Sequence, residues 1–204
     1  MPPRPPLRGR PPQVDPHELS LVALRLFERD GFDQVTMDDV ARAASVSRRT
    51  LFRLFPSKAD LVWHGLDEVL AGLQERTAKV ARSRASLDVL MDQVFAAGLA
   101  QLDDPKAARL ARRRLRLIGA SPALLGHQTL AAIQDVLTAM VAARSTKGDP
   151  PPALVARAFF AVAFASVLWW VEHEDSMPVR EALRAALGAL PHTSPRSIRR
   201  RNPT

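Results

Sequence analysis

Three helix-start patterns within the first sixty residues constrain the fold more than any other feature of this chain. In each of them, a small polar residue is followed three positions later by an acidic one. The pairs are Asp15 with Glu18, Thr36 with Asp39, and Ser57 with Asp60. The first side chain accepts a hydrogen bond from the backbone of the opening turn, and the acid bonds back to the residue before the helix. The patterns therefore predict several short helices in close succession.

Apolar residues recur at helical spacing after these starts. In the first helix they fall at i, i+3, i+4, i+7 and i+8, which forms one apolar stripe that Gly31 ends. A second helix is expected over about 36–44, and a third, capped by Ser47, over about 48–55. Later helices are expected at 57–82, 86–102, 105–119, 122–144, 152–174 and 178–189. Because no stretch alternates with the period of a strand, the sequence predicts an all-α fold of about nine helices.

Composition narrows the function classes. The chain has 204 residues, of which 47% are hydrophobic, so it is long and apolar enough to bury a core. Cysteine is absent, which excludes a disulfide scaffold, a thiol nucleophile and any cysteine-ligated metal. The formal net charge of +8 favours a polyanionic partner, either nucleic acid or an anionic membrane surface, although it also simply promotes solubility.

The distribution of proline, arginine and apolar residues divides the chain into four parts. We expect a flexible basic arm over 1–14, a small helical domain over 15–62, a larger helical domain over 63–190 and a flexible basic tail over 191–204. No secretory signal is visible. The longest uncharged apolar run, 158–171, has 14 residues, fewer than the roughly 20 that a spanning helix needs. These features favour a soluble, cytoplasmic protein.

The segment 26–62 has the layout of a helix-turn-helix, in which two short helices are joined by a tight turn and braced by another helix. The helix after the turn leaves Arg48, Arg49 and Arg53 free to face outward. Arginine is suited to a bidentate contact with guanine and to phosphate binding. The alternative is an ordinary solvated face. Residues 1–60 hold ten Lys and Arg against eight Asp and Glu, a balance of only +2, so charge alone does not indicate DNA binding.

The same segment resembles the DNA-binding domain of TetR-family transcriptional regulators. The resemblance covers about 19–62 and rests on Leu-Phe at 26–27, Gly-Phe at 31–32, Thr36, an acidic pair, Val-Ala, Val-Ser, Thr-Leu-Phe and Phe-Pro-Ser-Lys at 55–58. It implies DNA contacts from the recognition helix and its flanks. The candidates are Thr36, Ser47, Arg48, Arg49, Thr50, Arg53 and Lys58, with Arg8 and Arg10 of the basic arm in addition.

Two positions depart from the family pattern. Ser45 stands where the family usually has glycine in the turn, so we expect a serine in a left-handed or bridge conformation. Leu54 stands where the family often has tyrosine or histidine, which removes one hydrogen bond to a phosphate. The second change leaves a larger share of the contacts to Arg53 and the arm.

The larger domain resembles, over 114–124, the ligand domain of a TetR subgroup associated with acyl-CoA-like ligands. The resemblance implies an effector pocket among the middle helices, although each candidate also suits a plain core position or an exposed helix start. The candidates are Phe95, Leu99, Leu115, Ile118, Leu125, His127, Gln128, Phe160, Phe164 and Trp169. Five arginines between 109 and 116 either hold a ligand phosphate or form a solvated face.

The run 159–170 is apolar on every face, so this helix must be buried all round. A homodimer through the last two helices, about 152–189, would bury it, as would the centre of a monomeric core. No Glu-x-x-His pair, glycine-rich phosphate loop or nucleophile elbow is present, so an enzyme, a metal site and a cofactor are not expected. The sequence predicts a ligand-responsive, homodimeric repressor that binds a near-palindromic operator. The alternative is a helical protein that binds a membrane surface or a partner through its basic ends.

Overall fold

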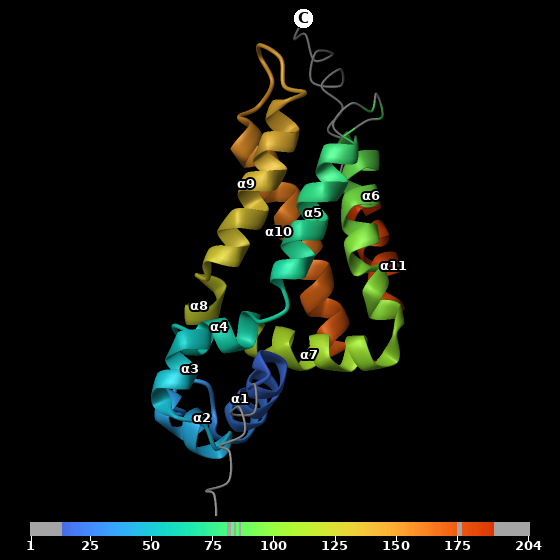
Figure 1. Cartoon of the computed structure of the whole chain (residues 1–204). Coiled ribbons are helices and arrows are strands. Elements are labelled where there is room, and N and C mark those ends of the chain that lie inside the picture. Colours follow the sequence, from blue (N-terminus) through green and yellow to red (C-terminus); the bar gives the residue numbers. More distant parts are fainter. Residues whose placement is uncertain (1–13, 81–82, 84, 86, 175–176, 190–204) are drawn as a thin grey trace, which may run out of the picture. The chain divides into compact units, whose positions relative to one another are not determined.

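The computed structural model of the chain describes residues 14–80, 83, 85, 87–174 and 177–189 (Figure 1). These residues form eleven α-helices and one short 3-10 helix, and no strand occurs among them. The predicted all-α class is confirmed. The chain divides into two compact units between Leu61 and Val62. We describe each unit by itself.

Unit one is a set of short helices around a small core. Its helices are α1 (Pro16–Asp30), α2 (Met37–Ala43), α3 (Arg48–Leu54) and the first part of α4 (Lys58–Trp63). The buried apolar residues here are Leu19, Ala23, Leu24, Phe27, Val35, Val40, Ala41, Leu51, Phe55 and Leu61. The buried Ser20 hydroxyl donates to the carbonyl of Leu61 at 2.8 Å and so joins α1 to α4.

The predicted helix starts are present as real caps. The side chain of Asp15 accepts from the backbone N–H of His17 at 2.8 Å. Thr36 and Asp39 form a complete capping box, with each side chain bonded to the other's backbone N–H. Ser57 and Asp60 do the same, at 3.3 and 2.8 Å. Each cap satisfies N–H groups that have no partner inside the helix.

The turn between α2 and α3 is closed by two backbone hydrogen bonds. Ser45 N–H donates to the carbonyl of Arg42 at 3.2 Å, and Val46 N–H donates to that of Ala41 at 3.0 Å. This pair of bonds is the Schellman ending of a helix, which places one residue in the left-handed region. That residue is Ser45, at φ +55°, and it is the one non-glycine residue with positive φ among those described. The left-handed option expected at this position is confirmed.

Unit two is a larger helical body. Its elements after α4 are α5 (Asp67–Val80), α6 (Leu87–Leu99), η1 (Ala100–Asp103), α7 (Pro105–Ala120), α8 (Pro122–Leu125), α9 (Gln128–Ala142), α10 (Pro152–Glu172) and α11 (Val179–Ala189). Helix α10 packs against α7, α9 and α11. The main core lies among α5, α6, α9 and α10 and is built from Leu73, Met91, Val94, Leu137, Met140, Val141, Ala156 and Phe159.

Two expected helices are each divided in two. The predicted helix 57–82 breaks between α4 and α5, where Gly65 adopts φ +83°. This backbone conformation is unfavourable for residues that carry a Cβ. The predicted helix 122–144 breaks between α8 and α9, where His127 has extended backbone and caps α9. The apolar spacing continues across both breaks, so periodicity alone does not reveal them.

Candidate nucleic-acid interface

Helix α3 has one inward and one outward face. Leu51 is fully buried and Phe55, just past the helix end, is 3% exposed. The outward side chains are those of Arg48, Arg49, Phe52 and Arg53, all of them exposed. The sequence prediction that the three arginines face outward is in accord with this arrangement.

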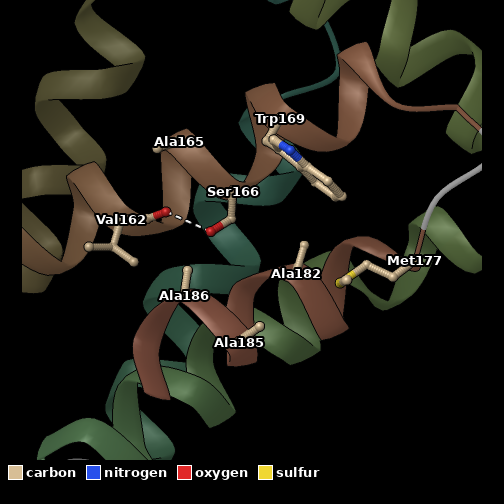
Figure 2. Close-up of a pocket in the computed structure, with 8 residues that line it drawn as sticks. All are labelled: Val162, Ala165, Ser166, Trp169, Met177, Ala182, Ala185 and Ala186. Atoms are coloured by element: carbon tan, nitrogen blue, oxygen red, sulfur yellow. Dashed lines mark hydrogen bonds between the residues drawn. The ribbon is translucent and has the colours of Figure 1, made fainter. Parts of the chain in front are cut away.

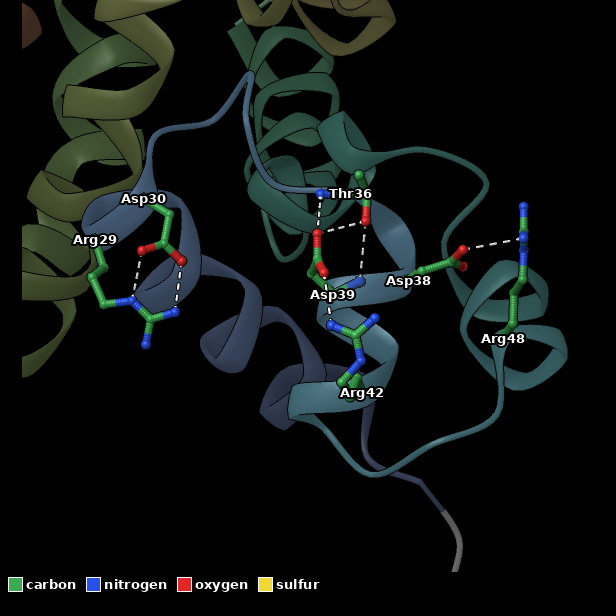
Figure 3. A network of polar contacts seen from close by, with 7 residues as sticks. All are labelled: Arg29, Asp30, Thr36, Asp38, Asp39, Arg42 and Arg48. Carbon is green, nitrogen blue, oxygen red and sulfur yellow. Dashed lines mark hydrogen bonds and ion pairs between the residues drawn. The ribbon is translucent and has the colours of Figure 1, made fainter.

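Arg48 differs from the other two arginines because it is already engaged. Its guanidinium donates to Asp38 of α2 at 3.2 Å (Figure 3) and lies over the ring of Phe52, 5.2 Å from the centroid. Arg49 and Arg53 form no ion pair or hydrogen bond with any described residue. These two guanidinium groups are therefore the available donors of this face.

The three hydroxyl candidates all take part in local helix caps, two of them as the cap residue. The Ser47 hydroxyl accepts from the Thr50 N–H at 3.1 Å and lies 2.8 Å from the Thr50 hydroxyl. The Thr36 hydroxyl donates to Asp39 at 2.6 Å, and this bond, with that from the Thr36 N–H, holds the pKa of Asp39 below its usual value (Figure 3). Arg42 pairs with the same carboxylate at 2.9 Å. Phosphate contacts from these hydroxyls remain predictions.

Lys58 has a structural role that the sequence did not indicate. Its ammonium donates to the backbone carbonyls of Phe32 and Asp33, at 2.8 and 3.3 Å, and lies 4.7 Å from the centroid of the Phe32 ring. These bonds fix the segment after α1 to the start of α4. Its predicted contact with a phosphate stays a prediction. Arg8 and Arg10 lie outside the described residues.

The ten candidate effector residues do not gather in one place. Phe95 and Phe160 pack against the main core, and Leu99 and Leu115 pack against a smaller cluster formed by Trp170, Val171 and Val179. Ile118 is fully buried, Leu125 and Gln128 are exposed, and Phe164 stacks on Phe160. Trp169 is 37% exposed. Their role in ligand binding remains a prediction.

His127 holds together the junction of α4, α8 and α9. Its ring stacks on that of Trp63 with centroids 5.2 Å apart, and its Nδ1 accepts from the Thr129 N–H at 3.3 Å. The Trp63 indole N–H donates to the carbonyl of Leu124 at 3.2 Å. The end of α4 is thereby anchored within unit two.

Helix α7 carries the dense arginine run, and its members have separate partners. The Arg112 guanidinium lies 3.7 Å from the Trp170 ring centroid and donates to the Trp170 carbonyl. Arg116 pairs with Glu174. Arg114 is 6% exposed, and burial lowers its pKa. The run is therefore spread around the helix instead of lining a single face.

An apolar groove of about 460 Å³ runs between α10 and α11 (Figure 2). Its walls are Val162, Ala165, Ser166, Trp169, Met177, Ala182, Ala185 and Ala186. The Ser166 hydroxyl donates to the carbonyl of Val162, so the hydroxyl adds little polarity to the groove. Of the predicted effector residues, Trp169 alone belongs to these walls. The sequence signal for the rest of the groove is the helical spacing of its alanines, three of which lie on α11.

Helix α10 is not buried all round within one chain. It has 21 residues, and its most apolar window has a mean hydropathy of 1.9 but is only 33% buried. Leu154 is 61% exposed. Within one chain, α10 thus supplies core residues on one side and is exposed on another, and its burial by a second copy stays a prediction. The helix is long and apolar enough to cross a membrane, a property shared by core helices of soluble proteins.

Comparisons with known proteins cover both units. Residues 21–63 match the family described as bacterial regulatory proteins, tetR family, and residues 88–195 match the MftR C-terminal domain. The protein named as mycofactocin biosynthesis transcriptional regulator MftR of Mycobacterium tuberculosis is 36% identical over 186 residues, which are 89% of this chain and 92% of that protein.

Solved structures show the same fold at low sequence identity. FadR of Thermus thermophilus, a transcriptional repressor in complex with lauroyl-CoA, superposes with a TM-score of 0.58 at 19% identity, covering 89% of this chain and 98% of its own. FadR of Bacillus subtilis in complex with stearoyl-CoA gives 0.56 at 17% identity, covering 84% and 95%.

Proposed function

This chain is a member of the TetR family of bacterial transcriptional regulators, and from that premise we propose that it is a ligand-responsive, homodimeric repressor of a near-palindromic operator. The observation that carries the proposal is the outward face of α3. Arg49 and Arg53 stand exposed there without partners in the described part of the chain. Arginines so placed suit the guanine edge in the major groove.

The proposed dimer uses α10 and α11. Only a third of the most apolar window of α10 is buried within one chain, and the alanines of the groove let another helix approach closely. Water contact with so much apolar area is unfavourable, and a second copy related by a two-fold axis would remove it. In such a dimer the two recognition helices would enter major grooves about 34–36 Å apart, which requires a near-palindromic site. A helix covered in this way suits a soluble, cytoplasmic protein.

The effector we propose is an amphipathic molecule of the acyl-CoA kind. The support is the two FadR structures, which bind lauroyl-CoA and stearoyl-CoA in the same fold. Such a ligand changes DNA affinity only if it binds one arrangement of the dimer more tightly than the other. We propose that it favours the arrangement whose recognition helices do not match the operator.

The DNA-binding part is tested with duplexes selected from random DNA on the purified full chain, followed by titration of the tightest one. We expect Arg49→Ala and Arg53→Ala each to weaken binding about 5- to 150-fold, the range for one bidentate base contact. Lys147→Ala removes one exposed charge in unit two and serves as the matched control. If both α3 variants bind like the control, α3 does not read the bases.

The dimer is tested by sedimentation. Wild type should sediment near twice 22.4 kDa, and Ala165→Glu, which places a charge in the groove, should give the single-chain mass. Ala78→Glu on the exposed face of α5 is the control and should remain dimeric. A monomeric wild type at micromolar concentration would remove the basis for the two-fold operator.

A further inference from the structure

Phe52 has an unusual position in unit one. It is 38% exposed, and it is the one large hydrophobic side chain exposed among the described residues of that unit. Of the other apolar side chains of α3, Leu51 is fully buried and Leu54 is half-buried. The exposed part of the ring is apolar surface that a partner meeting this seven-residue helix could cover.

The helix places this ring inside the arginine face. Successive residues are rotated by about 100° around the helix axis. An arc of about 140° therefore contains, in order, Arg48, Phe52, Arg49 and Arg53. Phe52 and Arg49 lie nearest the middle of that arc, so any surface that meets the arginines also meets the ring.

Arg48 steadies the ring from one side. Its guanidinium lies 5.2 Å from the ring centroid and is itself held by Asp38 of α2 at 3.2 Å. The ring and guanidinium attract each other because the aromatic face is negative. Asp38, Arg48 and Phe52 thus form a row of contacts from α2 to the outward face of α3.

The chemistry of the major groove identifies the partner of an apolar ring on this face. Base edges there present hydrogen-bond donors and acceptors, and their apolar group is the C5-methyl of thymine. Arginine cannot select that methyl, whereas an exposed phenyl ring can. We propose that Phe52 contacts a thymine methyl beside the bases read by Arg49 and Arg53, and so specifies an A·T pair within the operator. The inference rests on the proposed DNA-binding function.

The test removes the methyl alone. The probe is the tightest duplex recovered from random DNA, remade with each thymine replaced in turn by deoxyuridine. For wild type, one such replacement in each half-site should weaken binding about three- to five-fold, the factor for losing the burial of one methyl group. Phe52→Ala should bind the thymine and deoxyuridine duplexes equally. Phe52→Leu, which keeps an apolar side chain, should retain the preference for thymine.

The outcomes separate this contact from the function it rests on. Recovery of a sequence-specific duplex whose deoxyuridine forms all bind wild type like the parent overturns the Phe52 contact alone, as does a thymine preference that survives in Phe52→Ala. Selection without any sequence preference overturns the DNA-reading function and this contact with it. Lys147→Ala, an exposed charge change in unit two, should keep the full thymine preference.

Discussion

Replacement of Ser45 by glycine should raise the free energy of unfolding of unit one, because it relieves the one left-handed non-glycine residue described. Ser45 sits at φ +55°, where a Cβ crowds the backbone. Its side chain is exposed and makes no hydrogen bond with the described residues, so nothing local offsets that crowding. The two backbone bonds that close the turn come from the N–H groups of Ser45 and Val46, and glycine would preserve both.

The magnitude follows from two opposing terms. The left-handed conformation costs a non-glycine residue about 1–2 kcal/mol. Glycine lowers the free energy of unfolding by about 0.5–1 kcal/mol, because the unfolded chain is more flexible at a glycine and loses more entropy on folding. The net stabilisation is about 0.5–1 kcal/mol. Since the unfolding temperature of a chain of this size rises by roughly 2–4 °C per kcal/mol, the expected rise is about 1–4 °C.

The assay is denaturant unfolding of the full chain followed by far-ultraviolet circular dichroism. The matched control is Ala44→Gly, one residue earlier, where φ is −85° and no crowding exists to relieve. That variant should be less stable by about 0.5–1 kcal/mol, since only the entropic term acts. Changes of the same sign in both variants would refute the reasoning that Ser45 is strained.

Three further predictions concern other contacts. Hydrogen bonds, first that from Thr36, lower the pKa of Asp39, so its carboxylate stabilises the fold above the ordinary value of 3.8 and loses that effect as pH falls through the folded pKa. Asp39→Asn should therefore be less stable than wild type near neutral pH. The denaturation midpoints of the two proteins should draw together as the pH falls below 3.8. Trp63→Phe removes the bond to Leu124 and part of a buried ring, and thermal unfolding should report a loss of about 1–3 kcal/mol. Leu137→Ala opens a cavity at a fully buried site, and urea unfolding should report a loss of about 2–5 kcal/mol.

Features that a few neighbouring residues determine could be predicted from the sequence. The caps at Thr36 and Ser57 are complete within four residues, and both occur in the structure. The turn at Ser45 was also a local departure from a familiar pattern, and its left-handed backbone follows from that position. The outward direction of Arg49 and Arg53 follows from the spacing of the buried Leu51 on the same helix.

Features set by distant parts of the chain could not be predicted. Lys58 bonds to the carbonyls of Phe32 and Asp33, 26 and 25 residues away, and no local pattern encodes such a choice. The interpretation of 57–82 as one helix failed at Gly65, because a glycine inside an apolar period is compatible with either a continuing or a broken helix. The exposed face of α10 could not be predicted either. Because the helix is apolar on all sides, its sequence does not indicate which side the same chain covers.

The placement of the tryptophans gives the protein a built-in optical probe. The chain has three tryptophans and no tyrosine, and Trp63, Trp169 and Trp170 all come after the boundary between the units. Tryptophan fluorescence, excited at wavelengths where phenylalanine does not absorb, therefore originates wholly in unit two. Trp169 lines the groove, while Trp63 and Trp170 are 4% exposed. A blue shift on concentrating the protein would thus report from the groove, and a change in emission on adding DNA would show that binding alters the surroundings of a tryptophan in unit two.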